Sequence, residues 1–264
     1  MIVTILGINA IGDVVKIFEL PIIKLFAVVA ILDPLAVTTG VVDATIYGVP
    51  LFVLKIINIY LFAFWLIIHN LDIKDEKLPY TKAKFGFFIL VFLLFLSELV
   101  IEFLMFDAID IDKMVSCCGT IYSNSSTSLI SNIFVIDISI LLSLFYGLFL
   151  FLVVSYRLKL SYLFSITNVS FLIISIVSLI SFFGTYIYEL PTHHCPFCFL
   201  QKEYYYVGYF IYSFLFIGTF FGFVASIIKQ SQTYYQISLW FSFLYLVLVS
   251  AYPIVFYIKN GVWL

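Results

Sequence analysis

Two cysteines, Cys195 and Cys198, lie three positions apart and directly follow two histidines, His193 and His194. Thiols at this spacing can close a small disulfide or bind a soft metal ion, because thiolates are both nucleophiles and soft ligands. The imidazoles can carry protons near neutral pH or supply nitrogen ligands to a metal. The sequence therefore predicts redox or metal chemistry at residues 193–198.

The other two cysteines of the chain are adjacent, Cys117 and Cys118. Neighbouring Cα atoms are about 3.8 Å apart, whereas disulfides usually join Cα atoms about 4.4–6.8 Å apart. A bond between these two sulfurs would be strained and readily exchanged, in a loop of small polar residues. We favour an exchange role for this pair, and two inert buried cysteines are the alternative.

Aromatic residues surround the Cys-x-x-Cys motif, among them Phe197, Phe199 and Tyr204. They suit a quinone ring, or they belong to the aromatic belt found at membrane interfaces, which is the favoured interpretation for the tyrosines. Pro196 suits the first position of a helix. If a helix begins there, its free N–H groups and its dipole would stabilise a thiolate at the motif.

The composition indicates that these residues must act in or beside a membrane. The chain is 64% hydrophobic and only 11% charged, with a mean hydropathy of +1.18. Soluble domains carry about a quarter charged residues, and apolar runs of about eighteen residues or more indicate membrane-spanning helices. The sequence predicts an all-α, polytopic transmembrane helix bundle without a cleavable signal peptide. A net charge of −2 and the lack of a basic run argue against nucleic-acid binding.

Seven apolar segments are long enough to be membrane segments. The first is interrupted by charged residues and by Pro21, so an interfacial or re-entrant piece is the alternative there. Glycines 218 and 222 form a small-xxx-small pattern in the sixth segment, which favours close helix packing. The seven segments lie near residues 18–37, 47–69, 84–106, 132–157, 160–188, 204–229 and 236–258.

The lysine and arginine residues of the loops alternate between the two sides of the membrane. Seven follow the second, fourth and sixth segments, and three lie on the other side or beyond the last segment. The basic side is expected to face the cytoplasm, in a multi-pass protein of the cytoplasmic (inner) membrane. Both cysteine pairs then face the exoplasm, where disulfide chemistry is favoured. The two sets are Lys74, Lys77, Lys82, Lys84, Arg157, Lys159 and Lys229 against Lys113, Lys202 and Lys259.

Two carboxylates lie inside an apolar run, Glu98 and Glu102, four residues apart on one helical face. Intramembrane carboxylates are costly, so they usually face a protein interior or a wet cavity. We expect one of them, or Asp137, to take part in proton transfer together with His193 and His194. The alternative for the histidines is that they only cap a helix or hydrate the interface.

The pattern resembles the vitamin K epoxide reductase (VKOR) family of membrane disulfide-forming enzymes. Residues 195–198 (Cys-Pro-Phe-Cys) are close to the Cys-Pro-aromatic-Cys form of bacterial members, and Cys118, Ile121, Tyr122 and Ser123 fit the family's loop pattern. The resemblance covers residues 84–229, the expected VKOR-like four-helix core. Residues 1–83 and 230–264 would be additional membrane segments. The family's loop cysteines are usually several residues apart, whereas here they are adjacent.

The resemblance implies a four-helix bundle that holds a quinone, either ubiquinone or menaquinone. It implies that Cys195 exchanges with a loop cysteine, best aligned to Cys118, and that Cys198 delivers electrons to the quinone. An exoplasmic thioredoxin-like protein would be the partner, and Cys117 would stand for the second loop cysteine. Thiol–disulfide exchange gives each of these steps a physical route, since each is thiolate attack on a sulfur.

A metal-binding or metal-transport protein is the alternative function. His193, His194, Cys195 and Cys198 could together bind Cu(I), Zn(II) or Hg(II). No ligand-rich face continues along the membrane segments, and the cytoplasmic side has no cysteine. We therefore favour the redox interpretation.

Overall fold

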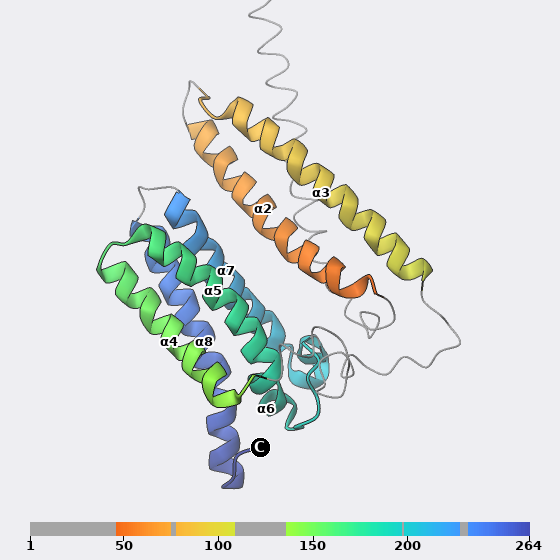
Figure 1. The fold of residues 1–264 in the computed structure, drawn as a ribbon, viewed down its shortest axis with the longest axis vertical. Helices are drawn as coiled ribbons and strands as arrows, with labels where there is room; N and C mark the ends of the chain where they lie inside the picture. The colour runs from red at the N-terminus through yellow and green to blue at the C-terminus, as the bar shows by residue number, and fades with distance from the viewer. Residues whose placement is uncertain (1–45, 75–77, 109–135, 197, 228–231) are drawn as a thin grey trace, which may run out of the picture. The chain divides into compact units, whose positions relative to one another are not determined.

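The structure, a computed structural model, describes residues 46–74, 78–108, 136–196, 198–227 and 232–264 (Figure 1). Within these ranges the chain forms helices and turns and no β-strand. The elements are α2 (Gly48–Lys74), α3 (Thr81–Asp107), α4 (Ile138–Arg157), α5 (Ser161–Ser178), the π-helical turn η2 (Leu179–Phe183), α6 (Gly184–Tyr188), the 3₁₀ turns η3 (Cys198–Leu200) and η4 (Lys202–Tyr204), α7 (Val207–Ile227) and α8 (Gln232–Asn260).

Six helices in the described ranges are long and apolar enough to cross a membrane. They confirm the all-α, multi-pass fold and six of the seven segments expected from hydropathy. The segment near residues 18–37 lies outside the described residues. The six spans are Pro50–Lys74, Thr81–Asp107, Ile138–Arg157, Ser161–Tyr188, Val207–Ala225 and Gln232–Asn260, the fourth of which combines α5, η2 and α6.

The chain divides into two compact units, residues 1–113 and residues 114–264. The first unit contains α2 and α3, and the second contains α4 to α8 and the Cys-x-x-Cys motif. The division of the chain at residues 83/84 and 229/230, expected from the resemblance to VKOR proteins, stays a prediction.

The α2–α3 hairpin of the first unit buries charged residues in opposite-sign pairs. Lys55 Nζ lies 3.2 Å from Glu98 Oε1 and 3.4 Å from Glu102 Oε2. The amide of Asn58 donates a hydrogen bond to the other oxygen of Glu98. Removing charges from water costs several kcal/mol per ion, so groups at this depth need a partner of opposite charge. The pairing ties the two helices together through groups that would otherwise destabilise the hairpin.

A second polar group joins the two helices near the turn between them. Asp72 accepts hydrogen bonds from the Tyr80 N–H and the Thr81 hydroxyl, each at 2.8 Å. Lys84 Nζ lies 3.3 Å from the same carboxylate, and the Trp65 indole N–H donates to the Lys84 carbonyl at 3.1 Å. Tyr80 provides no side-chain cap for α3, so Asp72 of α2 caps that helix from the neighbouring chain segment.

The second unit packs α4, α5, η2 and α8 around an aromatic core. The ring of Phe145 lies 5.7 Å from Phe171, 5.2 Å from Phe183 and 6.1 Å from Tyr245. The hydroxyl of the fully buried Tyr245 donates to the Ser175 carbonyl at 3.1 Å, as a buried tyrosine requires. This core fixes the long helix that leads to the cysteine loop.

The two glycines of α7 allow close contact with α8 and α5, as their spacing predicts. A Cβ atom at Gly218 would lie 2.7 Å from Ser242 Oγ, and one at Gly222 would lie 2.5 Å from Asn168 Oδ1. The Asn168 side chain donates to the Thr219 carbonyl at 2.6 Å. The close approach of these helices holds α7 against the helix that precedes the cysteine loop.

Candidate functional site

The Cys-x-x-Cys motif lies in the loop that joins α6 to α7 in the second unit (Figure 1). Helix α6 ends at Tyr188, and Glu189 follows with a left-handed φ of 53°. The Leu190 N–H donates to the Thr185 carbonyl at 3.0 Å, and Pro191 prevents the helix from continuing. The sequence thus ends the long helix a few residues before the first histidine.

The condition that a helix begins at Pro196 is not met, because α7 begins only at Val207, within the expected segment 204–229. Cys198 opens the short 3₁₀ turn η3, after which Gln201 is extended. Tyr205 and Tyr206 then adopt left-handed backbone conformations, with φ values of 54° and 56°. The motif is therefore followed by an irregular segment, and the N-terminus of α7 does not stabilise a thiolate at Cys195 or Cys198.

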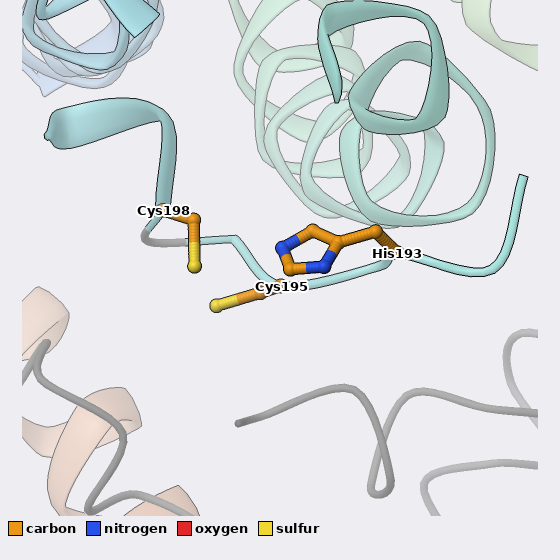
Figure 2. A group of neighbouring side chains, drawn as sticks. All are labelled: His193, Cys195 and Cys198. Carbon is orange, nitrogen blue, oxygen red and sulfur yellow. The ribbon is translucent and has the colours of Figure 1, made fainter. Parts of the chain in front are cut away.

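His193, Cys195 and Cys198 form a compact group (Figure 2). One ring nitrogen of the histidine and the two sulfurs all lie within 4.8 Å of one another. Cys195 is 1% exposed and Cys198 is 9% exposed. Two buried sulfurs at this spacing are candidates for a disulfide, after a change in side-chain conformation, or for a shared metal ion.

The imidazole of His193 contributes a nitrogen atom that is available for proton transfer or metal binding. Its Nε2 atom is buried and makes no hydrogen bond to any described residue. The ring packs edge-on against Tyr188, with centroids 4.2 Å apart. A buried nitrogen without a hydrogen bond is uncommon, and beside two thiols it can accept a proton or bind a metal.

Tyr188 holds both ends of the motif through its hydroxyl group. The hydroxyl donates a hydrogen bond to the Cys195 carbonyl and accepts one from the Phe199 N–H at 3.1 Å. Tyr188 is the last residue of α6 and is itself buried. The end of a membrane helix thereby sets the backbone geometry of the two cysteines.

Tyr212 of α7 holds the middle of the motif in the same way. Its hydroxyl donates to the Pro196 carbonyl, and its ring lies 5.5 Å from that of Phe199. A Cβ atom at Gly208 would lie 2.5 Å from the Phe199 ring, so only glycine allows η3 to pack this closely on α7. The loop is fixed from both flanking helices.

Phe199 and Tyr204, the expected aromatic wall, do lie beside the motif. Phe199 is 1% exposed and stacks on Tyr188 at 5.9 Å, and Tyr204 contacts the same ring at 4.8 Å. Phe197 lies outside the described residues. Tyr205 and Tyr206 are exposed, and their place in an interfacial belt stays a prediction. The aromatic residues thus divide into a packed set around Tyr188 and an exposed set.

His194 is not part of the compact group. Its Nδ1 atom donates to the Ile180 carbonyl at 3.0 Å, in the π-helical turn η2. This bond ties the loop to the preceding helix one residue before Cys195. The two histidines that are adjacent in sequence therefore have different surroundings in the structure.

The other residues expected to take part lie elsewhere or outside the described ranges. Cys117 and Cys118 fall outside the described residues. Glu98 and Glu102 lie in α3 of the first unit, where both pair with Lys55. Asp137 is the N-cap of α4 and accepts a hydrogen bond from the Ser139 N–H at 2.7 Å. Proton transfer by these carboxylates stays a prediction.

Sequence reasoning missed Tyr188 and Tyr212, the two residues that hold the loop. Each lies in an apolar segment, and a buried tyrosine needs a partner for its hydroxyl, which is the one signal the sequence offers. That signal does not identify the partner, because Tyr212 lies sixteen residues from Pro196 along the chain.

No protein-family model, curated protein or solved structure matches this chain.

Proposed function

We propose that this protein is a membrane thiol–disulfide oxidoreductase in which Cys195 and Cys198 are the reactive pair. The observation that carries the proposal is the compact group of two buried sulfurs and the His193 ring nitrogen, all within 4.8 Å of one another. A loop fixed by two tyrosine hydroxyls keeps the sulfurs close enough to form and break a bond.

The two sulfurs accept and release electrons in pairs. A reduced thioredoxin-like partner gives two electrons to a disulfide that involves Cys117 or Cys118, and exchange passes them to the Cys195–Cys198 disulfide. Each exchange breaks one S–S bond and forms another, and the partner is left as a disulfide. When Cys195 and Cys198 are joined again, two electrons and two protons leave the pair. The acceptor would be a membrane quinone held beside Cys198 by Phe199 and the rings around Tyr188, and it would supply a sink for two electrons and two protons.

His193 supplies the proton chemistry of the pair. Its Nε2 atom makes no hydrogen bond to a described residue, so it can take a proton from a neighbouring thiol and produce the thiolate that attacks. Because α7 begins at Val207, a helix N-terminus does not perform this task. The aromatic rings around Tyr188 support a quinone site on the Cys198 side, where Phe199 packs.

The charge distribution supports an exoplasmic position for the loop, in the cytoplasmic membrane. Arg157 and Lys159 lie where α4 leads into α5, at one end of the second unit. The cysteine loop follows the other end of the continuous helix Ser161–Tyr188. Basic loop residues favour the cytoplasm, which leaves the cysteine loop outside, where an oxidised pair persists.

The test measures quinone reduction by the purified protein in lipid nanodiscs. Cys195→Ser or Cys198→Ser should lower turnover roughly a hundredfold or more with either a reduced thioredoxin-like donor or a small dithiol, because the covalent step loses its sulfur. Replacing Cys117 and Cys118 should lower transfer from the protein donor more than transfer from the small dithiol. Unchanged turnover in the Cys195 and Cys198 variants would exclude the proposed route.

Binding of a soft metal ion is the second candidate, and the unpaired His193 Nε2 favours it. Two sulfurs and one nitrogen fit a three-coordinate soft ion such as Cu(I), and Zn(II) or Hg(II) also accept these donors. The proposed ligands are His193, Cys195 and Cys198. His194, the fourth ligand expected from the sequence, is left out of this set because its Nδ1 atom bonds to the Ile180 carbonyl.

Metal analysis after mild purification separates the two functions. Stoichiometric copper or zinc that is lost in Cys195→Ser and retained in His194→Gln would favour the metal site. A metal-free protein that reduces quinone would favour the redox pair. The His194 variant is the matched control, because it changes an adjacent imidazole that lies outside the compact group.

A further inference from the structure

A polar cavity lies at the turn between α4 and α5, at the opposite end of the second unit from the cysteine loop. Its volume is about 180 Å³. The continuous helix from Ser161 to Tyr188 has 28 residues. Since a helix rises about 1.5 Å per residue, the whole length of this helix separates the cavity from the cysteine loop. The residues that line the cavity include Ser155, Tyr156, Lys159, Ser161, Gln232 and Tyr235.

The backbone of this turn makes the cavity suitable for an anion. Lys159 takes a left-handed φ of 57°, the Leu160 N–H donates to the Ser155 carbonyl at 3.0 Å, and α5 then begins at Ser161. The N-cap residue, Leu160, provides no side-chain cap hydrogen bond to this helix. The N–H groups and the dipole of a helix start favour negative charge, and the Lys159 ammonium adds a full positive charge beside them.

Ser155 is a second, independent reason why the cavity suits a polar ligand. Its side chain is buried, the residue being 1% exposed, and its hydroxyl makes no hydrogen bond to any described residue. The same residue lines the cavity. A buried hydroxyl without a partner is costly, and a ligand oxygen would satisfy it.

The polar cavity is adjacent to an apolar groove between α4 and α8. The groove has a volume of about 540 Å³, and Tyr156 lines both the cavity and the groove. Aromatic and aliphatic residues form most of the groove wall, namely Phe149, Leu239, Trp240 and Phe243. A polar cavity beside an apolar groove on membrane helices suits an amphiphile, with its polar end in the cavity and its apolar chain in the groove.

We propose that this site binds an anionic phospholipid. The phosphate is held by Lys159, the Ser155 hydroxyl and the start of α5, and an acyl chain lies in the groove beside Trp240. The positive charge selects an anionic headgroup, and the length of groove within the membrane span selects a lipid over a soluble phosphate. The proposal is independent of the chemistry at the cysteine loop.

Native mass spectrometry of the full chain tests the proposal, with phosphatidylglycerol and phosphatidylcholine offered in equal amounts. Wild-type protein should retain phosphatidylglycerol about fivefold more, as expected for one basic residue near a headgroup. Lys159→Asn should remove this preference, since asparagine tolerates the left-handed backbone but carries no charge. Lys259→Asn, at an exposed lysine near the end of α8, is the matched control and should keep the preference.

Trp240→Ala keeps the test decisive if the turn itself is sensitive to change. The Trp240 side chain is exposed on the groove wall, so its loss should lower retention of both lipids without unfolding the protein. Equal retention of the two lipids by wild-type protein, or the same retention in the Lys159 and Lys259 variants, would overturn the proposal. Complete displacement of the lipid by inorganic phosphate would also overturn it and assign the cavity to a soluble anion.

Discussion

The α2–α3 hairpin and the cysteine loop both bury groups that are costly to remove from water, but they satisfy them differently. In the hairpin, Lys55 pairs with Glu98 and Glu102, and Lys84 pairs with Asp72. In the loop, the tyrosine hydroxyls bind the backbone of the motif. The buried Nε2 of His193 has no described hydrogen bond there.

This difference separates groups that hold the structure from groups that can react. A buried ion pair holds its two helices together because each charge needs the other, and the loss of either partner leaves an uncompensated buried charge. A thiol pair held by its backbone keeps its side chains available for bond exchange or for a metal. The comparison supports the proposal that the cysteine loop is the reactive site, while the ion pairs of the hairpin stabilise its two helices.

The largest effect on stability is expected from breaking the hairpin ion pairs. Lys55→Met leaves Glu98 without the nearest described ammonium and should destabilise the protein by about 3–5 kcal/mol. Unfolding in detergent, followed by circular dichroism, measures the loss. Lys82→Met is the control, because Lys82 is exposed on the same hairpin. Equal losses in the two variants would remove the structural role assigned to Lys55.

An intermediate effect is expected from Tyr188→Phe. The change removes the hydroxyl that joins Cys195 and Phe199, at a cost of about 1–3 kcal/mol for the groups left unpaired. Since about 1.4 kcal/mol is a factor of ten, exchange of the Phe199 amide hydrogen should accelerate roughly tenfold to a hundredfold. Tyr205→Phe, at a residue that is 90% exposed, should leave that rate unchanged. A slow Phe199 amide in the Tyr188 variant would show that the loop is held by other contacts.

The smallest effects on stability are expected from His193 and His194, and only the His193 substitution is expected to change the reactivity of the cysteines. His194→Gln loses the bond to Ile180 and should cost about 1 kcal/mol, with little change in the alkylation rate of Cys195 and Cys198. His193→Gln should change stability less, because its Nε2 makes no described bond, and should slow alkylation near neutral pH. The same alkylation rate in both variants would contradict the proton-accepting role of His193.

The membrane helices could be predicted from the sequence because each depends on a local property. An apolar run of about twenty residues crosses the hydrocarbon core whatever surrounds it, and the six described spans agree with the runs. The sequence also marks Glu98 and Glu102 as unusual, because two carboxylates inside an apolar run are a local feature. It does not predict that Lys55 is their partner, since hydropathy does not specify the register in which α2 and α3 pack.

The cysteine site was predictable only in part. The short separation of His193, Cys195 and Cys198 along the chain allows them to meet. It does not predict that His194, which is equally near in sequence, instead bonds to the Ile180 carbonyl. The start of α7 did not follow from Pro196, because two left-handed tyrosines and the packing of η3 on Gly208 override a local helix preference. The hydrogen bonds of Tyr188 and Tyr212 depend on how α6 and α7 approach each other, which the sequence does not reveal.

A redox titration of the purified protein tests the central claim most directly. Samples are equilibrated at a series of thiol–disulfide potentials, alkylated, digested and analysed by mass spectrometry for the bond between Cys195 and Cys198. The account predicts one two-electron transition in which this bond forms, and a loss of the transition in Cys198→Ser. If the two cysteines are alkylated independently at every potential and never form the bond, the proposed reactive pair does not exist.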